Sequence, residues 1–350
     1  MFEGCYTALV TPMKEKDPEE VDFRALEKLV EFQVASGVNG ILAMGTTGES
    51  ATLNWEEHTQ VIAKIKEFAR DRCTIIAGTG SNCTEECLRH TRHAVKHDIA
   101  AILLVEPYYN GPGSIEIRRE YMAPVAEAYP EVEVIPYVIP GRSGTQLLPE
   151  DLALLCRKHD NVNAVKEASG DLENMRRTRE CAGEKFRILS GDDGNTFTMM
   201  TDRDIGASGA VSVMSNVAPG AVQEMTEAVL EGDVDRGERL AGALAPLFDM
   251  VTVKTQEESP WGERLCKARN PVPVKTLMRV LGMPVGPCRR PLGRMTPQGL
   301  QVVQETARKV WDETPFIFEP VARVFEVDVD KRLNDPTILH DLVYDDPNSS

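Results

Sequence analysis

Lys166 stands near the end of a short apolar segment, Val-Asn-Ala-Val-Lys-Glu-Ala-Ser-Gly-Asp (162–171), which runs into a Gly-Asp turn. Lysine is seldom buried without a partner, and burial favours the neutral amine. A neutral amine can attack a ketone to form a Schiff base. The alternative is a lysine at a strand end whose ammonium group reaches water. Lys166 alone does not decide between these interpretations.

Other short apolar segments also end in residues that bind carboxylates or move protons. Gly-Thr-Thr-Gly-Glu-Ser (45–50) combines a tight turn with hydroxyl and N–H groups, a natural cradle for a carboxylate. Glu-Pro-Tyr-Tyr-Asn (106–110) and Ile-Pro-Tyr-Val-Ile-Pro-Gly-Arg-Ser-Gly (135–144) add tyrosines and an arginine. Leu-Ser-Gly-Asp-Asp-Gly (189–194) adds a turn whose aspartates are expected to cap the next helix. Each also has a structural alternative: an ordinary turn, a packed tyrosine or a solvated arginine.

Short apolar segments alternate with longer amphipathic ones, the pattern of repeated strand–helix units on a parallel sheet. The expected strands are 6–10, 40–44, 74–77, 101–105, 133–137, 162–165, 187–189 and 207–211. The expected helices between them include 23–35, 55–69, 85–96, 115–128, 149–158 and 172–181. This count predicts the α/β class and a (β/α)₈ TIM barrel. In that fold the chemistry lies at the carboxyl ends of the strands, where the segments above occur.

The chain is expected to have three parts: the barrel with its site at 1–218, a C-terminal helical region at 219–312 and an extension at 313–350. Helices are expected at 220–230, 236–251, 274–281 and 297–311. Residues 255–270 suggest a longer loop, and 324–329 alternates as an edge strand does. Prolines 315, 320, 336 and 347 argue against a long helix. We expect an arm that packs on its own or a neighbouring subunit, with a frayed tail at 345–350.

Composition excludes several partner classes. The 350 residues carry a formal charge of −16, which repels nucleic acid, and 42% are hydrophobic, enough for a large core. The N-terminus lacks a signal-peptide pattern, and the longest uncharged stretch, 205–223, is broken by Gly, Ser, Asn and Pro. We therefore expect a soluble, cytoplasmic protein without a membrane partner. The eight cysteines lack disulfide or zinc spacing, which predicts reduced thiols.

Together the ordered motifs Gly-Thr-Thr-Gly-Glu, Pro-Tyr-Tyr-Asn, Tyr-x-x-Pro-x-Arg, Val-Lys-Glu-Ala-Ser-Gly-Asp and Leu-Ser-Gly-Asp-Asp resemble the dihydrodipicolinate synthase family. This family belongs to the pyruvate-dependent Schiff-base aldolases, which include N-acetylneuraminate lyase. The resemblance covers about residues 1–312. It implies a lyase that condenses pyruvate with L-aspartate 4-semialdehyde in lysine and diaminopimelate biosynthesis. It also implies no metal or organic cofactor, because pyruvate itself is bound covalently on Lys166.

The resemblance assigns catalytic roles to four residues. Lys166 matches the lysine that forms the imine, and Tyr137 matches the tyrosine that shuttles protons. Thr46 and Tyr109 match the relay partners of that tyrosine. In the family the residue matching Tyr109 reaches in from a neighbouring subunit. A homo-oligomer is therefore expected, either a dimer or a tetramer built from two dimers.

The resemblance also assigns substrate contacts. Thr47 matches the residue that holds the pyruvate carboxylate, while Gly191 and Val211 match positions lining the pocket near the imine. Arg142 matches the arginine that binds the carboxylate of aspartate semialdehyde, and its guanidinium fork suits that role. Val138 departs from the family, because many members have asparagine after the tyrosine. That departure is expected to remove a polar group near the acceptor.

Two other functions stay open on the sequence. One keeps the imine but changes the acceptor, giving a lyase for a 2-keto-3-deoxy acid or for N-acetylneuraminate. Arg142 and the Thr46–Thr47 pair argue against it, since the sialate lyase usually has Ser-Thr there. The other is a non-catalytic regulator that binds pyruvate or lysine. Retention of Lys166 and Tyr137 together with their relay partners argues against that function.

A second set of residues matches the L-lysine feedback site that the family places at a dimer interface. The alternative is ordinary helix surface. Three features of the set favour binding of L-lysine. It offers a carboxylate to pair with the amine of the ligand, donors for the ligand carboxylate and an indole to cover the aliphatic stem of the ligand. The set therefore predicts feedback inhibition by L-lysine. Its members are Ser50, Trp55, His58, Asn82, Glu86 and Tyr108.

Overall fold

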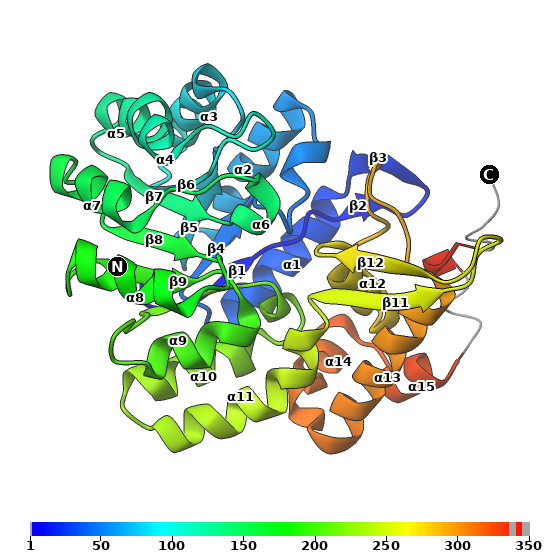
Figure 1. The fold of residues 1–350 in the computed structure, drawn as a ribbon. Helices are drawn as coiled ribbons and strands as arrows, with labels where there is room; N and C mark the ends of the chain where they lie inside the picture. Colours follow the sequence, from blue (N-terminus) through cyan, green and yellow to red (C-terminus); the bar gives the residue numbers. More distant parts are fainter. Residues whose placement is uncertain (1, 336–340, 345–350) are drawn as a thin grey trace.

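The computed structural model describes residues 2–335 and 341–344. Eight parallel strands are hydrogen-bonded side by side into a closed barrel (Figure 1). They are β1 (Gly4–Ala8), β4 (Gly40–Ala43), β5 (Thr74–Gly78), β6 (Ala101–Val105), β7 (Glu133–Val138), β8 (Ala164–Glu167), β9 (Arg187–Ser190) and β10 (Gly209–Ser212). β10 pairs with β1 to complete the ring. The predicted (β/α)₈ barrel is confirmed.

Helices follow the strands and surround the barrel (Figure 1). They are α1 (Phe23–Ala35), α2 (Trp55–Ala69), α3 (Thr84–Lys96), α4 (Ser114–Glu116), a π-helical turn (Ile117–Met122), α5 (Ala123–Ala128), α6 (Pro140–Ser143), α7 (Pro149–Lys158), α8 (Leu172–Ala182) and α9 (Thr196–Thr201). Short 3₁₀ turns lie at Ser50–Thr52, Asp193–Asn195 and Met214–Asn216. Local capping fixes several starts. Asn54 and Glu57, for example, form a reciprocal capping box at the start of α2.

Alternation along the strands creates two apolar layers. Side chains that point into the barrel, such as Tyr6, Leu42 and Leu189, form a small interior cluster. Their neighbours along each strand point outward and join the larger core between the strands and the helices. Residues at the carboxyl ends of the inward-facing rows therefore look into the mouth of the barrel, where a site can form.

Three predicted strands differ from the observed ones by two residues. β1 starts earlier than the predicted segment 6–10, whereas β8 and β10 start later than 162–165 and 207–211. The apolar Val162 and Ala207 precede the paired residues of β8 and β10, whereas β1 already pairs through Gly4 and Cys5, before the predicted segment. Hydrophobicity alone therefore does not locate the ladder. For β8 the shift matters, because Lys166 lies within the strand and its direction is set by the ladder.

The C-terminal helical region also forms as predicted in its main elements. It contains α10 (Pro219–Leu230), α11 (Val234–Asp249), α12 (Val272–Val280) and α13 (Pro297–Glu313). α10 packs against both α11 and β1, and α13 packs against α11 and α12. This packing brings α12 beside the barrel. The proposed division of the chain at residues 218 and 312 stays a prediction.

Two antiparallel hairpins were not foreseen. Residues 255–270, expected to be only a loop, contribute to a hairpin of β11 (Thr252–Glu257) and β12 (Arg264–Arg269). A second hairpin joins β2 (Met13–Lys14) to β3 (Asp17–Val21) after the first barrel strand. Many positions of both are charged and exposed, so neither carries the apolar alternation of a half-buried strand.

The C-terminal extension is helical where it is described, so the expectation of an edge strand at 324–329 is wrong. A 3₁₀ turn (Pro315–Ile317) leads into α14 (Glu319–Phe325) and α15 (Val329–Asn334). The backbone of Glu326 turns left-handed to end α14, and Asp328 caps α15. The arm packs on its own chain, where the ring of Phe325 meets that of Phe32 edge-on, with centroids 5.3 Å apart. Pro336, Pro347 and the expected tail at 345–350 lie outside the described residues.

All eight cysteines are unpaired, as their spacing predicts. Within the described part of the chain, no helix is both long enough and apolar enough to cross a membrane.

Candidate active site

Lys166 and Tyr137 lie opposite each other on adjacent barrel strands. The register of β7 and β8 pairs the two residues, and both side chains are about 5% exposed. The Nζ atom of Lys166 lies 4.2 Å from the centroid of the Tyr137 ring. Burial lowers the pKa of Lys166 to about 7, although the Asp193 carboxylate opposes that shift. A large fraction of the amine is therefore neutral near pH 7, the form that attacks carbonyls.

Gly191 lies against the side chain of Lys166. A Cβ atom at Gly191 would lie 2.9 Å from Cε of Lys166 and 2.8 Å from Cβ of Ala168. Only a residue without a side chain leaves that approach open. Val211 belongs to the same interior cluster as Tyr137. The structure thus brings together Lys166, Tyr137, Gly191 and Val211 as the sequence predicted.

The two threonines after β4 contact different residues. Thr46 hydrogen-bonds the Tyr137 side chain and lowers its pKa, but burial has the larger effect and raises that pKa to about 12. Tyr137 therefore keeps its proton at neutral pH. Thr47 is buried, and its Oγ1 accepts a 2.9 Å hydrogen bond from Nδ2 of Asn270. This leaves the hydroxyl proton of Thr47 free to be donated elsewhere.

Arg142 lies on α6 and lines a cavity of about 710 Å³ that also includes Thr46. Its Nη2 donates to the backbone oxygen of Asn270 at 3.0 Å. Burial is the main cause of the lowered pKa of Arg142, and repulsion from Arg269 adds to it. A carboxylate bound here would relieve that repulsion. Arg142 is thus poised over the cavity as an anion-binding group.

Glu106 holds the segment that carries Arg142. Its buried carboxylate accepts hydrogen bonds from the N–H groups of Ile139 and Leu147, at 3.0 and 2.7 Å, and from Oγ of Ser143 at 2.8 Å. Burial raises the pKa of Glu106, while these donors lower it. The sequence motif contained Glu106, but nothing in it indicated this anchoring contact.

Tyr109 is not brought to the site within this chain. Its side chain is 93% exposed, and its backbone has a φ of 80°, a left-handed conformation that side chains rarely adopt. The strained backbone presents the phenol to the surroundings rather than to Lys166. Its position stays compatible with the predicted contact to a neighbouring subunit, which a single chain does not test.

Most of the predicted lysine-binding residues line the same 710 Å³ cavity. Ser50, Trp55, His58, Glu86 and Tyr108 are lining residues, whereas Asn82 is not. The cavity therefore runs from Arg142 to the predicted feedback site.

Two histidines stack beside Trp55 in this cavity. The Trp55 ring stacks on His90, which in turn lies 4.9 Å from the His58 ring. Burial lowers the pKa of His58 to about 3 and that of His90 to about 4. The prediction did not include His90, although it lies on α3 four residues after Glu86 and lines the same cavity. His58 is a buried residue, not a solvated one on a helix surface.

The aspartate pair after β9 divides its roles. Asp192 caps the 3₁₀ turn through the N–H of Gly194, as expected. Asp193 does not cap a helix, because its buried Oδ2 accepts hydrogen bonds from the N–H groups of Val213 and Met214, at 2.9 and 3.0 Å. Its other oxygen has no hydrogen-bond partner among the described residues. Asp193 thus places a carboxylate near Lys166 and fixes the carboxyl end of β10.

Val138 does not face the acceptor side, contrary to expectation. Its side chain is buried in the outer core between strands and helices, whereas Tyr137 belongs to the interior cluster. The alternation of strand β7 explains the difference, since consecutive side chains point to opposite faces. The valine therefore removes no polar group from the mouth of the barrel.

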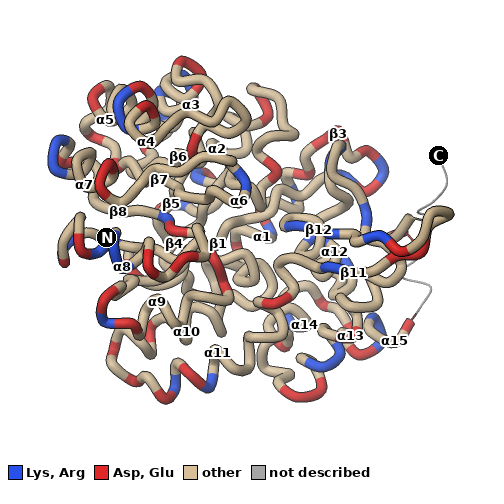
Figure 2. The backbone as a smooth tube through the Cα atoms, viewed as in Figure 1, with Lys and Arg blue, Asp and Glu red and all other residues tan. Residues whose placement is uncertain are grey.

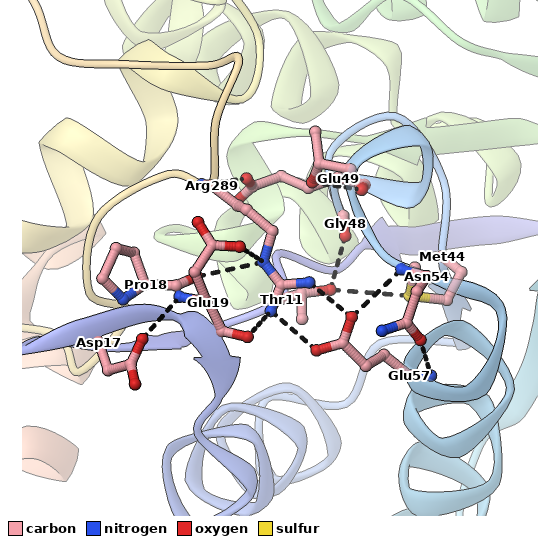
Figure 3. A network of polar contacts seen from close by, with 11 residues as sticks. Thr11, Asp17, Pro18, Glu19, Met44, Gly48, Glu49, Asn54, Glu57 and Arg289 are labelled. Carbon is pink, nitrogen blue, oxygen red and sulfur yellow. Dashed lines mark hydrogen bonds and ion pairs between the residues drawn. The ribbon is translucent and has the colours of Figure 1, made fainter.

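A buried network ties the Gly-Thr-Thr-Gly-Glu turn to the C-terminal region (Figure 3). The backbone N–H of Arg289 donates to Oε2 of Glu49 at 2.8 Å, and the guanidinium of Arg289 forms an ion pair with Glu57. Lys275 on α12 completes it with a 2.6 Å ion pair to Oε1 of Glu49. Lys275 could have been found by the criterion that singled out Lys166, because it too is a lysine within an apolar segment. Among the described residues, no cluster of His, Cys, Asp or Glu has the arrangement of a metal site.

Comparison with known proteins identifies the family of this chain. The model of the dihydrodipicolinate synthetase family matches residues 1–310. The chain belongs to that family. A curated relative, the 4-hydroxy-tetrahydrodipicolinate synthase of Syntrophus aciditrophicus, is 39% identical over 296 residues, covering 85% of this chain and 94% of the relative. The prediction of an enzyme of this family is confirmed.

Two similar solved structures of dihydrodipicolinate synthases contain ligands. Dihydrodipicolinate synthase of Cyanidioschyzon merolae with lysine bound has a TM-score of 0.79 and 34% identity, covering 88% of this chain and 98% of that one. The chloride-inhibited synthase of Acinetobacter baumannii, complexed with pyruvate, also has a TM-score of 0.79 and 34% identity, with coverage of 89% and 99%.

Proposed function

We propose that this family member is a 4-hydroxy-tetrahydrodipicolinate synthase, which condenses pyruvate with L-aspartate 4-semialdehyde in lysine and diaminopimelate biosynthesis. The observation that carries the proposal is Lys166, a buried amine with a pKa lowered to about 7 beside Tyr137. The names of the curated relatives support the reaction, and the pyruvate complex of a 34% identical synthase supports the first substrate.

In the proposed reaction the neutral amine of Lys166 attacks the ketone carbon of pyruvate, and loss of water gives an imine. Loss of a C3 proton converts the imine to an enamine, which attacks the aldehyde carbon of the second substrate. Tyr137 carries protons to and from these intermediates, since its phenol is protonated at neutral pH. Thr46, which hydrogen-bonds Tyr137, connects it to the cavity.

The carboxylates of the two substrates have separate candidate partners. Thr47 has its hydroxyl proton free for the pyruvate carboxylate, because Asn270 supplies the other hydrogen bond. Arg142 would pair with the carboxylate of the aldehyde. The outward direction of Val138 removes the reason to prefer an acceptor other than aspartate semialdehyde.

Borohydride trapping tests the proposal. Reduction in the presence of pyruvate should add a covalent adduct on Lys166, visible by peptide mass spectrometry, and Lys166→Met should abolish it. No adduct on the wild-type protein would refute the Schiff-base mechanism. Turnover of aspartate semialdehyde should exceed that of N-acetylneuraminate and of 2-keto-3-deoxy acids, and the reverse order would replace the proposed acceptor.

The same cavity supports feedback inhibition by L-lysine in a homo-oligomer. Glu86 offers a carboxylate for the ligand amine, Trp55 an apolar cover for its stem, and a lysine-bound neighbour is known in the family. The exposed Tyr109 would then complete the site of a second subunit. Saturating lysine should lower initial rates, and unchanged rates would contradict inhibition. Sedimentation should detect a dimer or tetramer, which a monomer at assay concentration would contradict.

A further inference from the structure

The outer face of the β11–β12 hairpin carries lysines in direct opposition. The antiparallel register places Lys254 opposite Lys267, and both side chains are exposed. Like charges directly opposite each other destabilise a strand pair. Arg269 follows Lys267 by two residues and so lies on the same face. The hairpin therefore keeps three cations together at a cost to its own stability.

In the part of the chain that the structure describes, no carboxylate forms an ion pair with Lys254, Lys267 or Arg269. Glu257 of the hairpin is buried and accepts a hydrogen bond from Thr255. The pKa of Lys267 is lowered first by Arg269, and Lys254 and Arg142 add to the shift. The chain has a net charge of −16, yet basic residues gather on this hairpin: Figure 2 shows blue segments on β11 and β12, with red segments farther along the same hairpin.

The cations continue into the candidate active site. Lys267, Arg269 and Arg142 line a cavity of about 480 Å³ between the hairpin and the segment before α13. Arg142 and Asn270 also line the 710 Å³ cavity, so the two cavities adjoin. Nη1 of Arg269 donates to the backbone oxygen of Gly141, the residue before Arg142, at 3.3 Å. The hairpin thus extends the positive charge of Arg142 outward toward solvent.

We propose that Lys267 and Arg269, which line the cavity, and Lys254, which lies opposite Lys267 on the exposed face of the hairpin, form a capture site for small carboxylate substrates that raises the substrate concentration at Arg142. The proposal rests on the proposed function, because it takes the anionic keto acid and aldehyde as ligands. A cavity of 480 Å³ suits a small molecule. The net charge of −16 repels nucleic acid and other large polyanions. Clusters of one charge sign beside a cleft raise local counter-ion concentration, an effect that salt weakens.

Steady-state kinetics of the Lys254→Gln/Lys267→Gln variant test the capture site. At low ionic strength kcat/KM for the anionic substrates should fall about tenfold while kcat is unchanged. The decline of kcat/KM with added salt should also be shallower than in the wild type. The matched control is Lys28→Gln/Lys96→Gln, which removes the same charge from exposed positions of α1 and α3, outside the hairpin. Neither control residue lines the 480 Å³ cavity that Lys267 lines. It should behave as the wild type.

A second variant separates electrostatics from hairpin folding. Lys254→Glu creates a favourable cross-strand pair with Lys267, so the hairpin is stabilised while the local charge falls by two. Capture predicts a kcat/KM at or below that of the double glutamine variant. A merely structural role predicts wild-type kcat/KM, which would overturn the proposal. The proposal would also be overturned if kcat/KM of the Lys254→Gln/Lys267→Gln variant depended on salt as that of the Lys28→Gln/Lys96→Gln control does. A changed oligomeric state of the hairpin variant with an unchanged salt dependence would overturn it as well.

Trapping of pyruvate distinguishes the two levels of failure. Borohydride reduction at saturating pyruvate and high salt should label every one of these variants at Lys166. If the hairpin variants are labelled at Lys166 and their kcat/KM depends on salt as in the wild type, the capture site is refuted and the proposed function is not. Absence of labelling on the wild type defeats the proposed function, and the capture site with it.

Discussion

The Nζ atom of Lys275 lies 2.6 Å from Oε1 of Glu49, and both side chains are fully buried. Lys275 comes from α12, whereas Glu49 ends the Gly-Thr-Thr-Gly-Glu turn after β4. The same ammonium also donates to the backbone oxygens of Thr11 and Pro287, at 3.1 and 2.9 Å. The turn that carries Thr46 and Thr47 is therefore fixed to the C-terminal region by a fully hydrogen-bonded ion pair.

Lys275→Met should destabilise the protein strongly, because it leaves the buried carboxylate of Glu49 without its cation. Removing one partner of a buried ion pair costs about 3–5 kcal/mol. Urea denaturation followed by circular dichroism measures the change in the free energy of unfolding. The double variant Lys275→Met/Glu49→Met should recover much of that loss, since no charge is then buried alone. Lys309→Met on the exposed face of α13 is the control, expected to change stability by no more than about 0.5 kcal/mol.

Equal destabilisation by Lys275→Met and by Lys309→Met would show that the ion pair contributes nothing. If the double variant were less stable than Lys275→Met alone, the loss of stability could not come from a buried carboxylate left without its cation.

The lowered pKa of Lys166 predicts the pH dependence of imine formation. Below pH 7 the amine is increasingly protonated and cannot attack, so the rate of pyruvate-dependent borohydride labelling should rise through about pH 7 and then level off. Rapid-quench labelling between pH 5.5 and 9 measures this profile. A rate that still rises tenfold per unit above pH 8 would indicate an amine with an ordinary lysine pKa.

The barrel could be predicted from sequence because its signal is repeated along the chain. Each strand is a short apolar run and most covering helices have a clear amphipathic stripe, so small errors at single ends do not change the count. The β11–β12 hairpin was not predicted because its exposed positions are charged, and because its inward face carries Val253 beside the polar Thr255 and Glu257 instead of a row of apolar residues. The helices α14 and α15 were not predicted because residues 324–329 alternate in polarity as a strand does. In the structure these six residues span the end of α14, the left-handed turn at Glu326 and the start of α15.

Within the candidate site, motifs located the residues at strand ends but not their supports. Asn270 contacts Thr47 across more than two hundred residues, and no local pattern encodes such a contact. Asp193 was expected to cap a helix, yet it bonds the end of a neighbouring strand that only the closed barrel brings near. Tyr109 is exposed in the single chain, and its contact with a second subunit stays a prediction.

Gly191→Ala should impair the site without unfolding the barrel. The new methyl group would lie 2.9 Å from Cε of Lys166, closer than carbon atoms approach without displacement. The lysine must shift, so we expect kcat to fall by about 10²-fold, the scale of a 1 Å misplacement of a reacting group. Steady-state assays give the rate, and thermal unfolding should show a modest change. The control Gly220→Ala adds a methyl group in open space at the start of α10. Undiminished kcat in Gly191→Ala would contradict the close approach.

Asn270→Ala should weaken pyruvate binding more than it slows the chemical step. It removes the Nδ2 donor to Thr47, so the threonine hydroxyl is no longer held with its proton available. Loss of one hydrogen bond predicts a rise in the KM for pyruvate of roughly threefold to tenfold. Asn195→Ala, which removes an exposed amide bonded to Asp192, is the control. A lower kcat at unchanged KM would instead place Asn270 in the chemical step.

His58 should make the protein sensitive to acid. Burial lowers its pKa to about 3, against 6.5 for an unperturbed histidine, so the native state stays neutral while the unfolded state takes up a proton. The contribution of neutral His58 to the free energy of unfolding is therefore fully present above about pH 6.5. It is lost as the pH falls toward 3, with a slope of up to about 1.4 kcal/mol per pH unit. His58→Leu should flatten that slope when urea denaturation is compared at pH 7, 6 and 5. The exposed His97→Leu should retain the wild-type slope, and identical slopes in both variants would rule out His58 as the acid-sensitive group.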